Sequence, residues 1–235
     1  MDLLARLAED PTRAALFLDV DGVLAPIVPR PEDARVPDET REELSRVNER
    51  YALVGCISGR AGADAQRIVG VPDLVYVGNH GLELDGEAAG WGERLQRFLV
   101  DVAWPATENK QLTASLHYRG SQDEAASRAA LEDVKARAER EGFVARFGRK
   151  VLEVLPPLDA HKGTAVRQLL AARNLSRALY AGDDTTDLDG FRALDGLELA
   201  VRVAVSSDEG PAELREAADL VVANPEEFVS LLRLL

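Results

Sequence analysis

The sequence has little cysteine and no long apolar run. A single cysteine, Cys56, excludes a disulfide framework within the chain and predicts a reducing compartment. No stretch approaches the roughly 18 apolar residues that a membrane-spanning helix needs. The first ten residues lack the basic-then-apolar pattern of a secretory signal. We therefore expect a cytoplasmic protein.

Basic residues are scarce relative to acidic ones. The chain carries 28 Lys and Arg against 41 Asp and Glu, which gives a net charge of −13. Because nucleic-acid binding depends on basic surfaces, this balance argues against a protein that binds a phosphate backbone. A small anionic ligand stays compatible with it, provided that a local positive site attracts the ligand against the field of the whole protein.

Short apolar runs alternate with longer helical patterns, which indicates an α/β fold with a mostly parallel sheet flanked by helices. The 235 residues leave room for one large domain, or for a domain that carries a substantial insertion. The predicted strands cover residues 14–18, 52–57, 74–77, 178–181, 199–205 and 220–222, and helices are predicted at 38–50 and 63–69.

The middle of the chain departs from this alternation. Its pattern predicts helices at 92–102 and 121–141, the second closed by Gly142, a strand at 114–118, and a hairpin of strands 143–147 and 150–155 across Gly148-Arg149. We interpret this block as an inserted smaller α/β cap domain, residues 83–158, with a core formed by residues 1–82 and 159–235. Pro156-Pro157 marks the end of the insertion.

Asp19-Val20-Asp21-Gly22 directly follows the first predicted strand, where open α/β sheets bind their ligands. A carboxylate here can attack phosphorus and form an aspartyl-phosphate. The second acid can protonate a leaving alkoxide. Gly22 lets backbone N–H groups approach a phosphate. A turn with acids that cap a helix is the alternative interpretation.

Ser58-Gly59-Arg60 follows the second predicted strand, and Lys162 opens the helix after the insertion. A hydroxyl and a glycine N–H at a helix N-terminus form a site for a phosphate oxygen. A lysine can neutralise a phosphoryl group together with an aspartate nucleophile. A helix-capping serine and an exposed surface lysine are the alternatives.

The segment from Gly182 to Asp187 follows another strand and places three acids, Asp183, Asp184 and Asp187, close together. Such a cluster at a sheet edge is costly unless a hard cation binds there, and Mg²⁺ prefers oxygen ligands. An acidic loop with a helix cap at Asp187 is the alternative.

The order of these four segments resembles the four-motif signature of the haloacid-dehalogenase-like phosphohydrolases, and the insertion resembles their cap domain. Finer details resemble the trehalose-6-phosphate phosphatase family in four segments: Phe17 to Ile27, Gly78 to Glu83, Glu108-Asn109-Lys110 and His117-Tyr118-Arg119. The strand around Glu153 is similar to the one that leads out of the family's cap. Val23 departs from the threonine of many members. The resemblance implies a Rossmann-like core, Mg²⁺ dependence and trehalose 6-phosphate as substrate.

On this basis we expect Asp19 to be the nucleophile and Asp21 the acid and base. Ser58 and Lys162, with the N–H groups of Gly22 and Gly59, are expected to hold the phosphoryl oxygens. The expected metal ligands are Asp19, the carbonyl of Asp21, and Asp183, while Asp184 or Asp187 acts through water or positions Lys162. The expected sugar contacts are Arg60, Asn79, His80 and Glu83, and in the cap Glu108, Lys110, His117, Arg119 and Glu153.

Several alternatives stay open at this point. A related enzyme could act on another sugar phosphate, such as sucrose phosphate or a glycosylglycerate phosphate. A phosphomutase shares the same first step. A non-catalytic module that binds a sugar phosphate is disfavoured, because Asp19, Asp21, Lys162 and Asp183 are all present. We expect a monomer without nucleic-acid or membrane partners, and a trehalose-phosphate synthase of the same pathway is a candidate partner.

Overall fold

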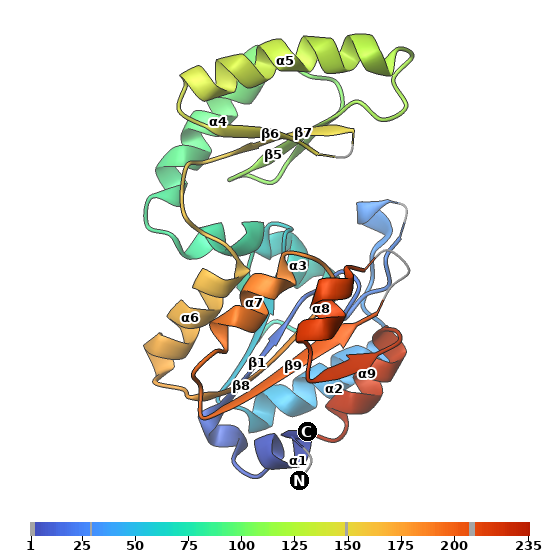
Figure 1. Cartoon of the computed structure of the whole chain (residues 1–235), viewed down its shortest axis with the longest axis vertical. Coiled ribbons are helices and arrows are strands. Elements are labelled where there is room, and N and C mark those ends of the chain that lie inside the picture. The colour runs from blue at the N-terminus through green and yellow to red at the C-terminus, as the bar shows by residue number, and fades with distance from the viewer. Residues whose placement is uncertain (1–2, 29, 149, 207–209) are drawn as a thin grey trace. The chain divides into compact units, whose positions relative to one another are not determined.

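The computed structural model describes residues 3–28, 30–148, 150–206 and 210–235. The chain divides into two compact units, residues 1–81 with 160–235, and residues 82–159 (Figure 1). We call the first the core unit and the second the cap unit. The division falls one residue away from each boundary that we expected from the sequence.

The core unit contains a six-stranded sheet in the order β10-β9-β8-β1-β2-β3, and every pairing in it is parallel. The strands are β1 (Ala14–Leu18), β2 (Leu53–Ile57), β3 (Val75–Val77), β8 (Arg177–Gly182), β9 (Leu199–Val205) and β10 (Leu220–Val222). All residues of β1, β2 and β8 are buried, as is typical of strands covered on both faces. The predicted α/β fold class is thereby confirmed.

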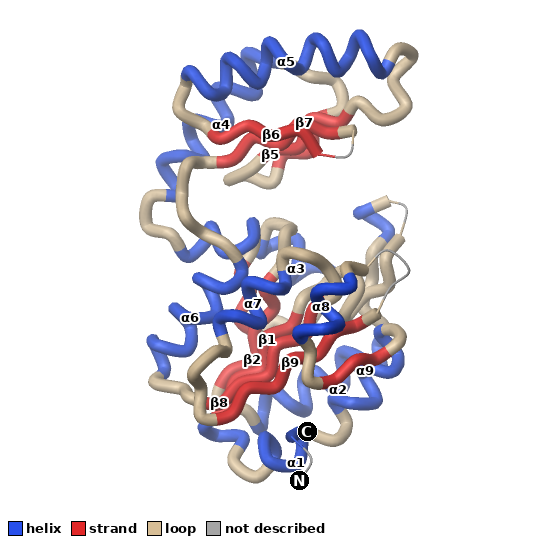
Figure 2. The backbone as a smooth tube through the Cα atoms, viewed as in Figure 1, coloured by secondary structure: helices blue, strands red, loops and turns tan. Residues whose placement is uncertain are grey.

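Helices cover both faces of this sheet (Figure 2). The α-helices are α1 (Leu3–Ala8), α2 (Asp38–Arg50), α3 (Gly62–Val69), α6 (Lys162–Arg173), α7 (Asp187–Ala193), α8 (Ala212–Ala217) and α9 (Pro225–Leu232), and the short 3₁₀ turns are η1 (Pro11–Arg13), η2 (Pro31–Asp33) and η3 (Asn79–Leu84). Buried residues of α1, α2, α3 and α9 join one apolar cluster with β1, β2 and β8. Helices α6, α7 and α8 contribute none to that cluster, because they pack on the opposite face.

The cap unit is built on an antiparallel sheet in the order β4-β5-β7-β6. Its strands are β4 (Thr107–Asn109), β5 (Ala114–His117), β6 (Val144–Gly148) and β7 (Val151–Leu155), and its helices are α4 (Ala88–Val102) and α5 (Glu124–Arg140). Both helices lie over one face of the sheet (Figure 1). Alternate residues, among them Leu116 and Leu152, point into the apolar cluster beneath them.

The element boundaries follow local capping chemistry. Helix α5 begins later than predicted, because the side chain of Asp123 accepts a hydrogen bond from the N–H of Ala126 and so caps the helix. It ends as predicted near Gly142, whose φ of 89° suits a glycine beyond a helix end. The predicted hairpin corresponds to β6 and β7. Arg149, in its turn, lies outside the described residues.

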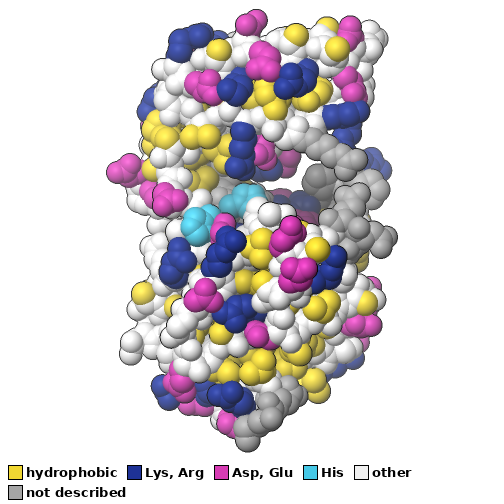
Figure 3. Space-filling view, in the orientation of Figure 1, with side chains coloured by type: hydrophobic (Ala, Val, Ile, Leu, Met, Phe, Trp, Pro, Cys, Tyr) yellow, Lys and Arg dark blue, Asp and Glu magenta, His cyan; other side chains and the backbone are white. Residues whose placement is uncertain are grey.

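The surface mixes charges of both signs over both units on the face that Figure 3 displays. Within the described residues, the helices are too short or too polar for any of them to cross a bilayer.

Candidate functional site

Asp19 lies at the carboxyl end of β1, between the ends of β8 and β2. Its N–H donates to the carbonyl of Ala181 at 3.0 Å, which extends the ladder by one residue. One carboxylate oxygen, Oδ1, accepts from the N–H of Val20 at 2.7 Å, and the other, Oδ2, accepts from Lys162 Nζ at 2.7 Å. The side chain is therefore fixed by a backbone donor and by a cation at the sheet edge.

Lys162 is buried between two acids that come from different segments of the chain. Its Nζ lies 2.7 Å from Asp19 Oδ2 and 2.8 Å from Asp187 Oδ1. The exposed fractions of the three side chains are 1% for Lys162, 8% for Asp19 and 0% for Asp187. Lys162 opens α6, and the side chain of His161 caps that helix by accepting from the N–H of Gly163. The cap fixes the turn that carries the ammonium group.

Asp187 organises the loop that follows β8. Its Oδ1 accepts from Lys162 and from the Tyr180 hydroxyl at 2.8 Å, and its Oδ2 accepts from the N–H groups of Asp183 and Asp184 at 2.9 and 3.0 Å. A Cβ on Gly182 would lie 2.2 Å from Asp187 Cγ, so only glycine permits this close approach. With four donors on its two oxygens, Asp187 acts as a structural acceptor that positions Lys162.

Burial and mutual repulsion control protonation in this cluster. Burial and the neighbouring charges of Asp187 and Asp184 raise the pKa of Asp183 to about 7. Burial also raises the pKa of Asp19, against the opposing charge of Lys162. Burial disfavours the charged form of Lys162, but the carboxylates of Asp187 and Asp19 outweigh it and raise its pKa. The lysine is therefore a permanent cation in the site.

The carboxylates of Asp19, Asp183 and Asp187 meet the geometric requirement of a cation site. One oxygen from each lies within 4.8 Å of the others. Hard divalent cations take oxygen ligands, and a carboxylate with a raised pKa gains a counter-charge when a cation binds. Because both oxygens of Asp187 already accept two hydrogen bonds each, Asp19 and Asp183 are the better candidates for direct ligands. Asp184 lies outside this group, and its Oδ1 accepts from Thr186.

Gly22 has a different role from the one that we expected. Its N–H donates to the carbonyl of Ala25 at 2.8 Å and closes the turn after Asp21, so it does not point at a phosphoryl oxygen. The residue has a φ of 79°, and a Cβ there would lie 2.1 Å from Asp183 Oδ2. Glycine is required because Asp183 packs against this turn, and the expectation of a phosphate-binding N–H at Gly22 is corrected accordingly.

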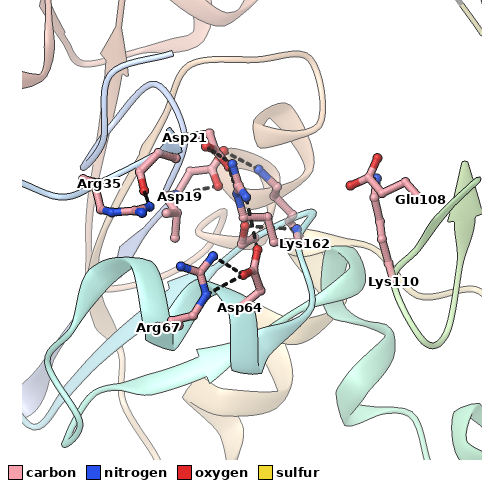
Figure 4. A network of polar contacts seen from close by, with 12 residues as sticks. Asp19, Asp21, Arg35, Asp64, Arg67, Glu108, Lys110 and Lys162 are labelled. Carbon is pink, nitrogen blue, oxygen red and sulfur yellow. Dashed lines mark hydrogen bonds and ion pairs between the residues drawn. The ribbon is translucent and has the colours of Figure 1, made fainter. Parts of the chain in front are cut away.

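Asp21 pairs with Arg60, which follows β2. Arg60 Nε donates to Asp21 Oδ2 at 2.6 Å and Nη2 donates to Oδ1 at 2.9 Å. Figure 4 shows Asp21 beside the Asp19–Lys162 pair, with Asp64 and Arg67 near them. In this structure the guanidinium that we expected to contact the sugar is bound to carboxylates.

Ser58, Gly59, Asn79 and His80 lie together where β2 and β3 end. The Ser58 hydroxyl accepts from the N–H of Arg60 at 3.2 Å, and the Ser58 carbonyl accepts from the N–H of His80 at 2.9 Å. Asn79 and His80 adopt φ angles of 51° and 55°, uncommon for residues with a side chain. A Cβ on Gly59 would lie 2.6 Å from the His80 ring, so the imidazole packs on the glycine. The two loops thus form one structured edge.

The remaining predicted residues belong to the cap unit. Glu108 is opposite Ser115, and Ser115 is opposite Glu153, so the two acids share one face of the sheet, away from the apolar cluster. Glu108 lies 3.3 Å from His117 and 3.8 Å from Lys110. Figure 4 shows the Glu108–Lys110 pair.

Two further predicted residues belong to the cap unit. Glu83 lies in η3. Arg119 is exposed beyond the end of β5 and takes part in none of these ion pairs.

Sequence reasoning missed three kinds of partner. Tyr180 was assigned only to a strand, although its hydroxyl holds Asp187. Asp64 holds Arg60 at 3.1 Å, and the spacing of four residues was a signal that could have identified it. Arg146 contacts Glu153 at 2.8 Å across the β6–β7 pair, which only the strand register shows.

A family model and curated relatives point to one family. A family model for trehalose-phosphatase matches residues 17–223. The chain is 30% identical over 256 residues to a probable trehalose-phosphate phosphatase 3 from Oryza sativa subsp. japonica, covering 93% of this chain and 68% of the rice protein. It is 32% identical over 226 residues to a trehalose-phosphate phosphatase from Mycobacterium marinum, covering 86% of this chain and 57% of that protein.

A solved structure shows the same fold. The crystal structure of a trehalose-6-phosphate phosphatase related protein superimposes with a TM-score of 0.73 at 23% identity, covering 93% of this chain and 95% of that chain. At this identity the likeness concerns the fold alone. The α/β core sheet and the second unit are thus both features of a known architecture.

Proposed function

The chain belongs to the trehalose-phosphatase family, and we propose that it hydrolyses trehalose 6-phosphate to trehalose and phosphate through an aspartyl-phosphate on Asp19. The observation that carries the chemistry is the buried Asp19–Lys162–Asp187 arrangement beside Asp183 at the carboxyl edge of the sheet. Buried acids with raised pKa values around a cation are typical of functional sites, and this arrangement suits a nucleophile and a bound metal ion.

In the first step a carboxylate oxygen of Asp19 attacks phosphorus, and the bond from phosphorus to the sugar 6-oxygen breaks. The departing oxygen takes a proton from Asp21. Lys162 lies against the nucleophile and stabilises the negative charge of the transferring phosphoryl group. The Ser58 hydroxyl and the Gly59 N–H are the proposed donors to the phosphoryl oxygens.

In the second step a water molecule attacks phosphorus and passes a proton to Asp21. The bond between phosphorus and Asp19 breaks, and inorganic phosphate leaves. Asp21 is thereby restored to its protonated form for the next cycle, and Asp19 is restored as a carboxylate.

Mg²⁺ is the proposed cofactor, held by Asp19, the carbonyl of Asp21, and Asp183. When bound, it would supply positive charge to the phosphoryl oxygens. The raised pKa of Asp183 supports this assignment, because a cation would offset the cost of the buried negative charge. Asp187 serves the same site by fixing Lys162 and the loop of Asp183 and Asp184.

The cap unit is the proposed sugar-recognition unit. Glu108, Lys110 and Glu153 supply charged donors and acceptors, and His117 adds an imidazole; such polar groups bind sugar hydroxyls in pairs. Asn79 and His80 of the core unit, with Glu83 and Arg119, are further proposed contacts. We also propose that the protein acts as a cytoplasmic monomer in the same pathway as a trehalose-phosphate synthase.

The deciding experiment measures phosphate release from trehalose 6-phosphate, sucrose phosphate, a glycosylglycerate phosphate and p-nitrophenyl phosphate. We expect the highest kcat/KM on trehalose 6-phosphate. EDTA should abolish release from every substrate and added Mg²⁺ should restore it. A higher kcat/KM on another sugar phosphate would contradict trehalose 6-phosphate as the substrate but not the proposed chemistry. Activity that survives EDTA would contradict the metal assignment.

A further inference from the structure

Arg60 holds the carboxylate of Asp21 at two points. Nε donates to Oδ2 at 2.6 Å and Nη2 donates to Oδ1 at 2.9 Å. The planar guanidinium has fixed donor directions, so a pairing of this kind sets the rotation of the carboxylate as well as its position. The Arg60 side chain is 14% exposed and that of Asp21 is 38% exposed, so a largely buried guanidinium holds a carboxylate that the solvent can reach.

The guanidinium is itself held by a second acid. Nη1 of Arg60 donates to Asp64 Oδ2 at 3.1 Å, and Asp64 Oδ1 accepts from Arg67 Nη2 at 2.6 Å. Asp64 and Arg67 both belong to α3, where a spacing of three residues brings side chains together. A chain of contacts therefore runs from α3 through Asp64 and Arg60 to Asp21. Figure 4 labels Arg67, Asp64 and Asp21 along it.

We propose that Arg60 is a positioning residue for Asp21 and that Asp64 fixes Arg60 in this role. The inference rests on the proposed function, in which Asp21 gives a proton to the departing oxygen. Proton transfer requires hydrogen-bond reach and alignment, so a carboxylate that rotates freely would transfer the proton poorly. Arg60 can keep one oxygen of Asp21 while the other turns to the substrate, because Nη1 stays on Asp64.

The geometry favours this role over direct sugar recognition. Nε, Nη1 and Nη2 of Arg60 are all engaged by carboxylates of the core unit. These contacts take up at least three of the five N–H groups of the guanidinium and so turn it towards Asp21 and Asp64.

The test compares kcat/KM on phenyl phosphate and p-nitrophenyl phosphate. Neither substrate carries a sugar. Phenolate is a more basic leaving group than p-nitrophenolate, so cleavage of phenyl phosphate depends more on a proton from Asp21. Since kcat/KM covers only the steps up to release of the phenol, later hydrolysis of the aspartyl-phosphate does not enter. We expect Arg60→Ala to lower the phenyl to p-nitrophenyl ratio of kcat/KM by about 10-fold to 30-fold, a part of the contribution of a general acid.

Milder variants sharpen the expectation. Arg60→Lys keeps the charge but loses the two-point contact, so its phenyl to p-nitrophenyl ratio of kcat/KM should lie between those of Arg60→Ala and the wild type. Asp64→Ala should lower the ratio by about threefold, since it acts one contact further away. Arg46→Ala is the matched control, because Arg46 pairs with Glu43 at 2.7 Å on α2 of the same unit. It should leave the ratio unchanged.

Two outcomes would overturn the inference. One is an equal loss on both aryl phosphates for Arg60→Ala and Asp64→Ala. The other is a further fall of the ratio when Arg60→Ala is added to Asp21→Asn, since a residue that acts only through Asp21 has no effect in its absence. If the wild type cleaves both aryl phosphates but not trehalose 6-phosphate, the proposed substrate fails and the inference about Arg60 is still tested.

Discussion

The polar groups of the core unit and of the cap unit are held in opposite ways. In the core unit, Lys162 and Asp187 are 1% and 0% exposed, and each has more than one charged or hydrogen-bonded partner. In the cap unit, Glu108 and His117 are 41% and 44% exposed and are joined by one contact of 3.3 Å. The core acids are locked by tertiary structure, and the cap acids lie on an accessible sheet face.

This difference matches two tasks. Transfer of a phosphoryl group needs groups that are fixed before the substrate arrives, since their reorganisation would add to the barrier. Recognition of a sugar needs accessible polar groups, because the sugar hydroxyls must displace the water bound to them. Substitutions in the core unit should therefore affect turnover and stability, whereas those on the cap sheet should affect substrate affinity.

The largest expected effect is that of Asp19→Asn. The amide is a poor nucleophile, so kcat should fall by about 10⁴-fold or more on every phosphate ester. The fold should survive, because Lys162 keeps Asp187 as a partner. Phosphate release and thermal unfolding measure the two effects, with Asp195→Asn, an exposed partner of Arg202, as the control. Substantial turnover by Asp19→Asn would remove the nucleophile assignment.

Asp187→Asn should have the next largest effect, and mainly on stability. In the wild type, four donors point at the two carboxylate oxygens of Asp187. In Asp187→Asn an NH₂ group takes the place of one oxygen and faces two of these donors. The variant also removes one of the two negative charges beside the ammonium group of Lys162. Loss of one partner of a buried pair costs about 3–5 kcal/mol. Thermal unfolding should show a much lower midpoint than for Asp189→Asn, which alters an exposed pair with Arg192. Equal unfolding midpoints for the two variants would contradict the larger contribution to stability that we assign to the buried acid.

The smallest effect is expected in the cap unit, from Lys110→Ala. Removal of one charged donor should raise KM for trehalose 6-phosphate by about 10-fold, with kcat/KM on p-nitrophenyl phosphate unchanged. Lys135→Ala, which removes a pair with Glu139 on α5, is the control in the same unit. If both substrates respond equally to Lys110→Ala, the division of tasks between the two units is wrong at this residue.

Much of the core site could be predicted from the order of residues alone. Asp19, Asp183 and Lys162 each stand beside the end of a predicted element, and parallel strands bring such ends to one edge. The α/β class follows from the alternation of apolar runs with helical patterns. Strand β4 escaped prediction because three residues are too few to show a period.

The sequence by itself determined which chemical groups the site contains and at which edge of the sheet they gather. Only the tertiary structure decided which group holds which. Lys162 donates to Asp187, and Arg60 donates to Asp21. The N–H of Gly22 donates to the carbonyl of Ala25. The physical reason is that the side-chain partners are distant in the chain: 25 residues separate Lys162 from Asp187, and 39 separate Arg60 from Asp21. For Lys162 and Asp19 the separation is 143 residues. Their distances therefore depend on strand register and helix packing.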